Sequence, residues 1–189
     1  VDAGGRPGKG TLVGAVNALL SPTSYLSQSG RLSVSGGCRA FDQSADGYFR
    51  SEGAGVILLK PLSLAQADGD TIYGVIKGTA VNHSGQMETN IDAQAQVIVD
   101  AYTHAHVDIE RVRYIETHGV GIASEDVAEI NSLKKAFAQL ATLQGKPVSQ
   151  TPHCGLGTLK NHVGHLEAAA GMASVIKALL TLYHQIIPA

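Results

Sequence analysis

The sequence of 189 residues has no tryptophan, only two cysteines, and few charged residues, which make up 16% of the chain. Two cysteines without a pairing pattern exclude a disulfide framework and fit a reducing compartment. Lysine and arginine number 14 against 16 aspartates and glutamates, and no basic run alternates with aromatic residues. The sequence therefore offers no groove for nucleic acid.

No uninterrupted hydrophobic run is long enough to span a membrane. The most apolar stretch, residues 172–188, contains Lys177 and His184, whereas a membrane helix needs about 18 apolar residues. Residues 1–10 are rich in glycine and lack the apolar centre of a signal peptide. We therefore expect a cytoplasmic protein that binds neither membranes nor nucleic acids.

What the sequence does contain is an alternation of two kinds of apolar segment, within a composition that is 44% apolar. Short apolar runs between glycine and proline predict strands, and apolar residues at every third or fourth position predict amphipathic helices. The predicted strands are 11–20, 54–60, 71–79, 111–116 and 155–159, and the predicted helices are 91–106, 127–140 and 166–183. This order predicts an α/β fold with layered sheets.

Neither end of this pattern is complete. The strand at 11–20 has no predicted strand before it, and residues 186–189 stop where another strand could begin. A sheet that lacks its neighbours exposes unpaired backbone groups. We therefore expect a fragment, or a half that another segment completes, with residues 1–10 as an atypical lead-in from an excised or processed segment.

A histidine follows the predicted strand 111–116 within two residues. His118 stands in the sequence ETHGVGI at 116–122, and ligands and catalytic side chains gather at strand ends in α/β proteins. Gly119 and Gly121 allow a substrate to pass close to the backbone. The motif indicates either part of an active site or a glycine-rich turn with an incidental histidine.

A second cluster lies between the last predicted strand and the last helix. It contains Lys160, His162 and His165. A helix N-terminus disfavours the imidazolium form, so a neutral ring there can hydrogen-bond a carbonyl or accept a proton. No cysteine or carboxylate stands at ligand spacing from the two histidines, so we expect no metal site.

The third segment is CRAFD at 38–42, continued by ADGYFRSEGAG at 45–55, which predicts a shaped loop before a buried strand. Cys38 has no histidine or helix N-terminus beside it in the sequence to lower its pKa. Cys154 lies in the apolar approach to a strand, where inert buried thiols are common. We expect neither cysteine to be catalytic.

Together these motifs resemble the ketosynthase domains of modular polyketide synthases, which are β-ketoacyl synthases with the thiolase fold. The residues that carry the resemblance are LVGAVN at 12–17, CRAFD at 38–42, ADGYFRSEGAGVILLKPL at 45–62, TIYGVIKGTAVNHSG at 71–85, YIETHGVGI at 114–122 and LGTLKNHVGHLEAAAG at 156–171. The stretch DAQAQVIVDAY at 92–102 is most similar to ketosynthases of trans-acyltransferase assembly lines.

The resemblance implies an incomplete α/β fold of the layered thiolase type (αβαβα), with mixed sheets flanked by helices. It implies one partial ketosynthase-like domain over residues 1–189. Residues 11–80 then form the end of the first thiolase half with an inserted loop, and residues 81–189 form the start of the second half.

The resemblance also implies roles for single residues. In this family a cysteine takes the acyl chain from the phosphopantetheine thioester of an acyl carrier protein, and two histidines promote decarboxylation of the malonyl extender and stabilise the oxyanion. His118 and His165 match these histidines, Lys160 matches the active-site lysine, and Glu129 matches the glutamate that anchors it. His162 stands in place of an asparagine of the family. The segment that faces the phosphopantetheine arm consists of Gly119, Val120, Gly121 and Ile122. In this segment Val120 and Ile122 replace two threonines of the family.

The cysteine motif that the family places before Leu12 is missing, because residues 1–10 read VDAGGRPGKG. We therefore expect a truncated, non-elongating domain with a structural, docking or dimerisation role, because covalent catalysis needs the thiolate. The expected partners are an acyl carrier protein, neighbouring polyketide synthase domains and a second copy of the chain, with no bound cofactor. One alternative is a part of an active β-ketoacyl synthase whose cysteine-bearing half is supplied by another segment. Another is a hydrolase or lyase that uses His118 and His165 without a covalent step.

Overall fold

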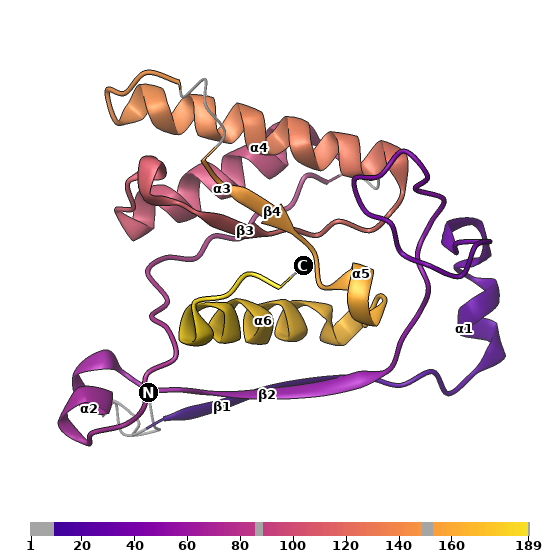
Figure 1. Cartoon of the computed structure of the whole chain (residues 1–189), viewed down its shortest axis with the longest axis horizontal. Helices are drawn as coiled ribbons and strands as arrows, with labels where there is room; N and C mark the ends of the chain where they lie inside the picture. Colours follow the sequence, from indigo (N-terminus) through magenta and orange to yellow (C-terminus); the bar gives the residue numbers. More distant parts are fainter. Residues whose placement is uncertain (1–9, 86–88, 149–152, 189) are drawn as a thin grey trace. The chain divides into compact units, whose positions relative to one another are not determined.

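The computed structural model describes residues 10–85, 89–148 and 153–188, so residues 1–9 of the predicted lead-in lie outside the described residues. Strands are interspersed with helices along this part of the chain (Figure 1). The strands are β1 (Thr11–Asn17), β2 (Gly53–Leu59), β3 (Tyr114–Glu116) and β4 (Gly155–Gly157). The helices are α1 (Pro22–Leu26), α2 (Leu62–Ala67), α3 (Ile91–Ala105), α4 (Ala123–Leu143), α5 (Lys160–Val163) and α6 (Ala170–His184).

The described residues fall into two compact units. The first unit consists of residues 10–27, 50–75 and 165–188. The second consists of residues 28–49, 76–85, 89–148 and 153–164. Each unit is therefore built from segments that lie far apart in the sequence.

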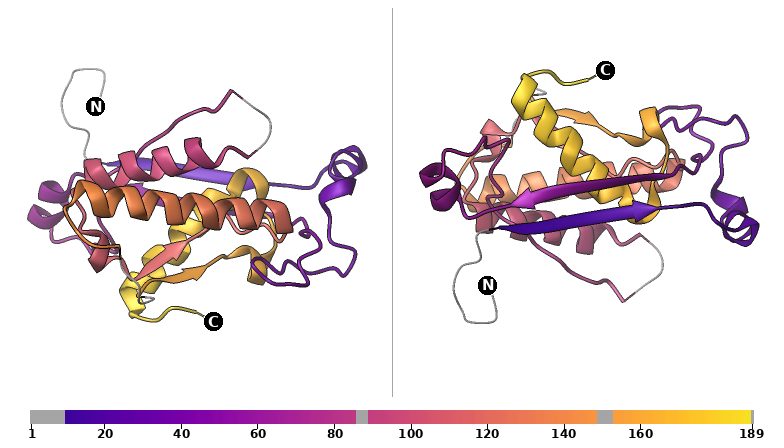
Figure 2. Two further views of the ribbon diagram at one scale, coloured as in Figure 1. Left: turned by 90° about the horizontal axis from the view of Figure 1, so that it is seen from above. Right: turned by 90° about the horizontal axis from the view of Figure 1, so that it is seen from below.

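The first unit is an antiparallel strand pair covered on one face by α6. β1 pairs with β2 so that Gly14 lies opposite Val56. A side chain at Gly55 of β2 would meet α6 directly, because a Cβ atom there would lie 2.8 Å from Met172 Cγ and 2.9 Å from Ile176 Cδ1. Glycine at this position lets the helix lie close against the strands. The view from below in Figure 2 shows α6 crossing this strand pair.

The opposite face of the same strand pair is apolar and exposed. The register places Leu12 beside Leu58 and Val16 beside Ala54, so these side chains share one face. Leu12 is 73% exposed and Val16 is 66% exposed, and Val56 and Leu58 are similar. An apolar face of this kind is typical of a surface that another protein segment covers.

The second unit combines a parallel strand pair with two long helices. β3 pairs with β4 in parallel, and α3 packs along α4 (Figure 1). α3 begins after Asn90, whose side-chain oxygen accepts a hydrogen bond from Ala93 N at 2.9 Å, as expected of a helix N-cap. The core between the helices contains Ala95 and Val99 of α3 together with Ala136, Leu140 and Ala141 of α4, and Ile109 from the 3-10 turn after α3 completes it.

The structure confirms most of the predicted elements and corrects several boundaries. β1, β2 and α3 lie where the sequence predicts them, but the predicted strand 111–116 is shortened to β3, because Ile109–Arg111 form a 3-10 turn. The predicted last helix begins with a 3-10 turn at Glu167–Ala169, and α6 starts only at Ala170. No helix within the described residues is long and apolar enough to cross a membrane.

The predicted strand at 71–79 is wrong. In the described residues this segment has no strand assignment, and it packs on helices instead of pairing with another strand. Gly74 lies against Leu179 and Leu182 of α6, and Gly78 lies against the backbone of α3 at Ala101. The apolar pattern of the segment therefore reflects contact with helices. The short helix α2, which follows Pro61, is not predicted from the sequence.

Candidate active site

The candidate site of the second unit begins where β3 and β4 end. Because the two strands are parallel and Glu116 lies opposite Gly157, the segments that follow them leave the same edge of the sheet. Thr117 N continues the ladder by donating to Gly157 O at 2.7 Å. Thr158, the residue after β4, donates through its hydroxyl to His118 O and Gly119 O. The sequence motif at 116–122 therefore meets the beginning of the motif at 156–171, within the second unit.

Lys160 and His118 are in direct contact at this edge. Lys160 is buried, at 4% exposure, and its Nζ donates to His118 O at 2.5 Å. The same Nζ lies 3.5 Å from His118 Nδ1. An ammonium group can only donate, so Nδ1 acts as the acceptor and the ring proton of neutral His118 is on Nε2.

Glu129 of α4 fixes the turn that carries His118. Its carboxylate accepts hydrogen bonds from His118 N at 2.7 Å and from Gly119 N at 2.8 Å. Burial lowers the pKa of Lys160, and the negative charge of Glu129 opposes this effect. Glu129 thus holds the backbone of the histidine, and the anchoring of Lys160 that the family implies stays a prediction.

The electrostatics of this group favour the neutral form of His118. The ring reaches solvent on one side, yet the protein atoms packed around the rest of it lower the pKa of His118 by desolvation, and the charge of Lys160 lowers it further. Burial also lowers the pKa of Lys160, and this effect is opposed by nearby acidic groups, of which Glu129 is the strongest. A neutral imidazole beside an ammonium group is suited to stabilising a developing oxyanion.

The segment from Gly119 to Ile122 folds over a small core. Val120 is only 1% exposed and packs with Cys38 and Tyr48, while Ile122 packs at the edge of this cluster. Gly121 has a positive φ of 76°, and a Cβ atom there would lie 2.7 Å from Gly47 O. The structure thus places the Val120 side chain in the core, and a role of this segment in binding the phosphopantetheine arm stays a prediction.

The CRAFD loop at 38–42 packs against the segment 119–122, a contact that the sequence did not predict. Cys38 donates through its thiol to Val120 O at 3.5 Å, and burial raises the pKa of this thiol. Ala40 N donates to the side chain of Asn161 at 3.0 Å.

The second cysteine has a similar property, because desolvation also raises the pKa of the Cys154 thiol. Both thiols therefore resist conversion to the nucleophilic thiolate.

Asp126 joins the loop to the histidine turn. Its buried carboxylate, at 3% exposure, accepts hydrogen bonds from Phe41 N at 2.8 Å, Val120 N at 3.0 Å and Gly121 N at 3.3 Å. The first turn of an α-helix favours an acidic residue, and Asp126 stands in the first turn of α4.

We expect Asp126→Ala to lower the free energy of unfolding by about 3 kcal/mol or more, because it leaves three backbone N–H groups without their acceptor. Urea denaturation followed by circular dichroism measures this loss. The matched control is Glu125→Ala, which removes an ion pair to the half-exposed Arg31 and should cost at most about 1 kcal/mol. Equal losses for the two variants would contradict the role of Asp126.

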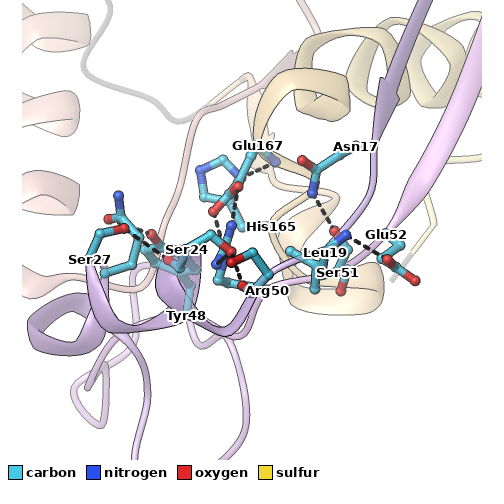
Figure 3. Close-up of polar contacts among 12 residues, drawn as sticks. Asn17, Leu19, Ser24, Ser27, Tyr48, Arg50, Ser51, Glu52, His165 and Glu167 are labelled. Carbon is cyan, nitrogen blue, oxygen red and sulfur yellow. Dashed lines mark hydrogen bonds and ion pairs between the residues drawn. The ribbon is translucent and has the colours of Figure 1, made fainter.

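His165 belongs to the first unit and has a different environment. Its Nδ1 accepts a hydrogen bond from Glu167 N at 2.9 Å, so its ring proton is also on Nε2 when the ring is neutral (Figure 3). Arg50 binds the carboxylate of Glu167 through two hydrogen bonds of 2.7 Å. His162 lies exposed on α5, and its supporting role stays a prediction.

Solved structures similar to this chain are thiolase-fold ketosynthases. The oxazolomycin ketosynthase domain OzmH KS7 of Streptomyces albus JA3453 shares 37% sequence identity with a TM-score of 0.87, covering 96% of this chain and 32% of that chain. The ketosynthase from module 6 of the bacillaene synthase of Bacillus subtilis 168 shares 36% identity, also with a TM-score of 0.87, covering 96% and 33%. The chain thus has part of the thiolase-like α/β fold, as predicted.

The family profiles agree with this class. The profile of the β-ketoacyl synthase C-terminal domain matches residues 73–189, and that of the N-terminal domain matches residues 9–65. The chain belongs to the β-ketoacyl synthase family. The division predicted at residue 80 is not tested by these matches and stays a prediction.

Curated relatives are polyketide synthases. Polyketide synthase PksN of Bacillus subtilis (strain 168) is 47% identical over 180 residues, which are 92% of this chain and 3% of PksN. Polyketide synthase ThaG of Burkholderia thailandensis is 45% identical over 184 residues, which are 94% of this chain and 3% of ThaG. The chain therefore spans about a third of the solved ketosynthases and a small part of these synthases.

Proposed function

We propose that this chain supplies the histidine and lysine groups of a ketosynthase site that promotes decarboxylative Claisen condensation on acyl chains carried by an acyl carrier protein. The observation that carries the proposal is the network of His118, Lys160 and Glu129. Its hydrogen bonds hold the imidazole with Nδ1 towards the ammonium group and with its proton on Nε2. A purely architectural domain has no evident need for a hydrogen-bond network that fixes the tautomer of a histidine.

In the proposed reaction the C–C bond to the malonyl carboxylate breaks, and carbon dioxide leaves. The electron pair moves into the thioester carbonyl and forms an enolate, whose oxygen becomes negative. An Nε2–H donor directed at that oxygen stabilises the charge as it develops. In the second unit the contact of Lys160 with Nδ1 leaves the ring proton of His118 on Nε2, and in the first unit the hydrogen bond from Glu167 N does the same for His165. The positive charge of Lys160 lowers the energy of the anion further.

The condensation also needs a thiolate that forms the acyl-enzyme, and neither cysteine of this chain is suited to that role. Cys38 donates its thiol to Val120 O inside the core, and desolvation raises the pKa of both Cys38 and Cys154. We propose that a cysteine-bearing segment of a ketosynthase supplies the nucleophile. The exposed apolar face of β1 and β2, which includes Leu12 and Leu58, is the surface that this segment would cover.

The acylated and malonylated phosphopantetheine arms are substrates in this proposal, and no resident cofactor is required. The partners are then an acyl carrier protein, the neighbouring domains of a polyketide synthase and a second copy of the ketosynthase. Similarity to PksN and ThaG supports this context. The trans-acyltransferase subtype and a cytoplasmic location belong to the same proposal.

A second candidate function is architectural, without chain elongation. The observation that favours it is the burial of Val120, at 1% exposure, at a position where the resemblance implies a threonine, as it does at Ile122. A hydrophobic core residue offers no hydrogen bond to a phosphopantetheine arm. In this case the chain would serve for dimerisation or for docking of a carrier protein.

Co-expression of the chain with the cysteine-bearing segment of a related ketosynthase domain separates the two functions. Intact-mass analysis then follows acylation of the cysteine and condensation with malonyl carrier protein. The first proposal predicts an acyl-enzyme and a β-ketoacyl product, both lost when that cysteine is replaced by alanine. A stable complex that binds carrier protein but yields neither species would overturn it and favour the architectural function.

A further inference from the structure

We propose that Arg50 and Glu167 form a positioning pair that sets the tautomer and direction of His165. The inference deepens the proposed function and rests on it, since it explains how this chain prepares one of its two oxyanion donors. The pair joins segments 117 residues apart within the first unit. Figure 3 shows Arg50, Glu167 and His165 side by side.

The first step is the unusual backbone of Glu167. Its φ angle is +44°, in the left-handed region that residues other than glycine rarely adopt. This conformation directs Glu167 N to His165 Nδ1, at 2.9 Å. Backbone strain of this kind persists only where surrounding contacts hold it, and it is concentrated at functional sites.

The second step is the contact that holds this turn. Arg50 Nε donates to Glu167 Oε1 and Arg50 Nη2 donates to Glu167 Oε2, both at 2.7 Å. This is the paired geometry in which a guanidinium group and a carboxylate bind most specifically. The Arg50 side chain is 5% exposed, so solvent competes little with the contact.

The third step is the fixation of Arg50 itself. Arg50 Nη1 donates to Ser24 Oγ of α1 at 2.9 Å, and the guanidinium lies 4.8 Å from the centre of the Tyr25 ring. Next to it, Ser51 N donates to His165 O at 3.1 Å. The His165 turn is therefore held through its backbone on one side and through the carboxylate of Glu167 on the other.

Two substitutions at position 167 separate this positioning role from a direct effect of the carboxylate. Glu167→Ala keeps the N–H group but removes the anchor, and alanine disfavours a positive φ, so the turn should relax. Glu167→Gly also removes the carboxylate, but glycine adopts a positive φ freely. We therefore expect the alanine variant to lose the hydrogen bond to His165 Nδ1 and the glycine variant to retain it.

The readout is ¹⁵N NMR of the histidine rings in the full chain, with His165 assigned through His165→Gln. The unsubstituted chain and Glu167→Gly should show His165 with its proton on Nε2 only, whereas Glu167→Ala should show a mixture of tautomers. Arg50→Met should behave like Glu167→Ala, and it should have no further effect in the Glu167→Gly background, because the carboxylate it binds is already gone. Lys60→Met, which removes an ion pair to Asp68 in the same unit, is the matched control and should leave the tautomer unchanged.

The outcome that would overturn the inference is a His165 tautomer that is the same in Glu167→Ala and in the unsubstituted chain, with circular dichroism showing both folded. An equal loss of the Nε2-protonated tautomer in the alanine and glycine variants would also overturn it. The carboxylate would then influence His165 by a route other than the backbone conformation of residue 167. The NMR result does not depend on activity, so it stands apart from failure of the proposed function. In the co-expressed complex, Glu167→Ala should reduce the decarboxylation rate by about 100-fold, and Glu167→Gly should recover most of it.

Discussion

His118→Ala should lower the rate of malonyl decarboxylation in the co-expressed complex by about 10²–10³-fold, the typical loss when one oxyanion donor is removed. The loss should appear mainly in kcat, because the donor contacts an oxygen that becomes negative only in the transition state. Carbon dioxide release from malonyl carrier protein measures this rate. The backbone contact between Lys160 and His118 O does not depend on the ring and should survive the substitution.

The matched control for this substitution is His104→Ala. His104 is an exposed histidine on α3, so its loss should leave the rate within a factor of about 2 of the unsubstituted value, as is usual for surface substitutions. A His118→Ala rate as high as that of the control would show that this imidazole stabilises no reacting oxygen.

Lys160→Met should lower the same rate by a similar factor, on the order of 10²-fold, and should also change its pH dependence. The charge of Lys160 lowers the pKa of His118, whereas Glu129, Glu125 and Asp126 raise it. Without the lysine only the raising charges remain, so the pKa of His118 moves upward. The neutral ring is the active form, so the acid limb of the pH–rate profile should move to higher pH.

Histidine NMR titration measures the shift directly, and the variant Lys135→Met is its control. Lys135 pairs with Asp92 on the surface of the helices α3 and α4, so its loss should leave the titration of His118 unchanged. A downward shift of the pKa in Lys160→Met, or no shift, would contradict the electrostatic link between the two side chains.

The elements that the sequence predicts well are those whose pattern has one explanation. The helical spacing of Ala95, Ile98 and Tyr102 predicts α3, and the apolar runs of β1 and β2 lie between clear turn residues. The segment 71–79 has an equally apolar pattern, but its contacts are with helices. Periodicity reports that a segment is buried, and it does not identify the neighbour that buries it.

The candidate site was predictable only in part, because a sequence pattern does not identify contacts between residues that are far apart along the chain. The motifs around His118 and Lys160 follow strands, so their meeting at one sheet edge could be expected from topology. The carboxylate of Asp126, by contrast, serves a loop 85 residues away, and Arg50 reaches Glu167 across 117 residues. No local pattern encodes such pairs. The left-handed turn at Glu167 is equally invisible in the sequence, because glutamate gives no sign of a positive φ.

The central claim is that the decarboxylating groups of a ketosynthase site lie on this chain. Its most direct test is carbon dioxide release from malonyl carrier protein by the co-expressed complex whose nucleophilic cysteine has been replaced by alanine, so that no acyl-enzyme can form. The account predicts release well above the protein-free rate, and its loss when His118 or His165 is replaced by alanine. Release at the protein-free rate, or release that survives both histidine substitutions, would contradict it.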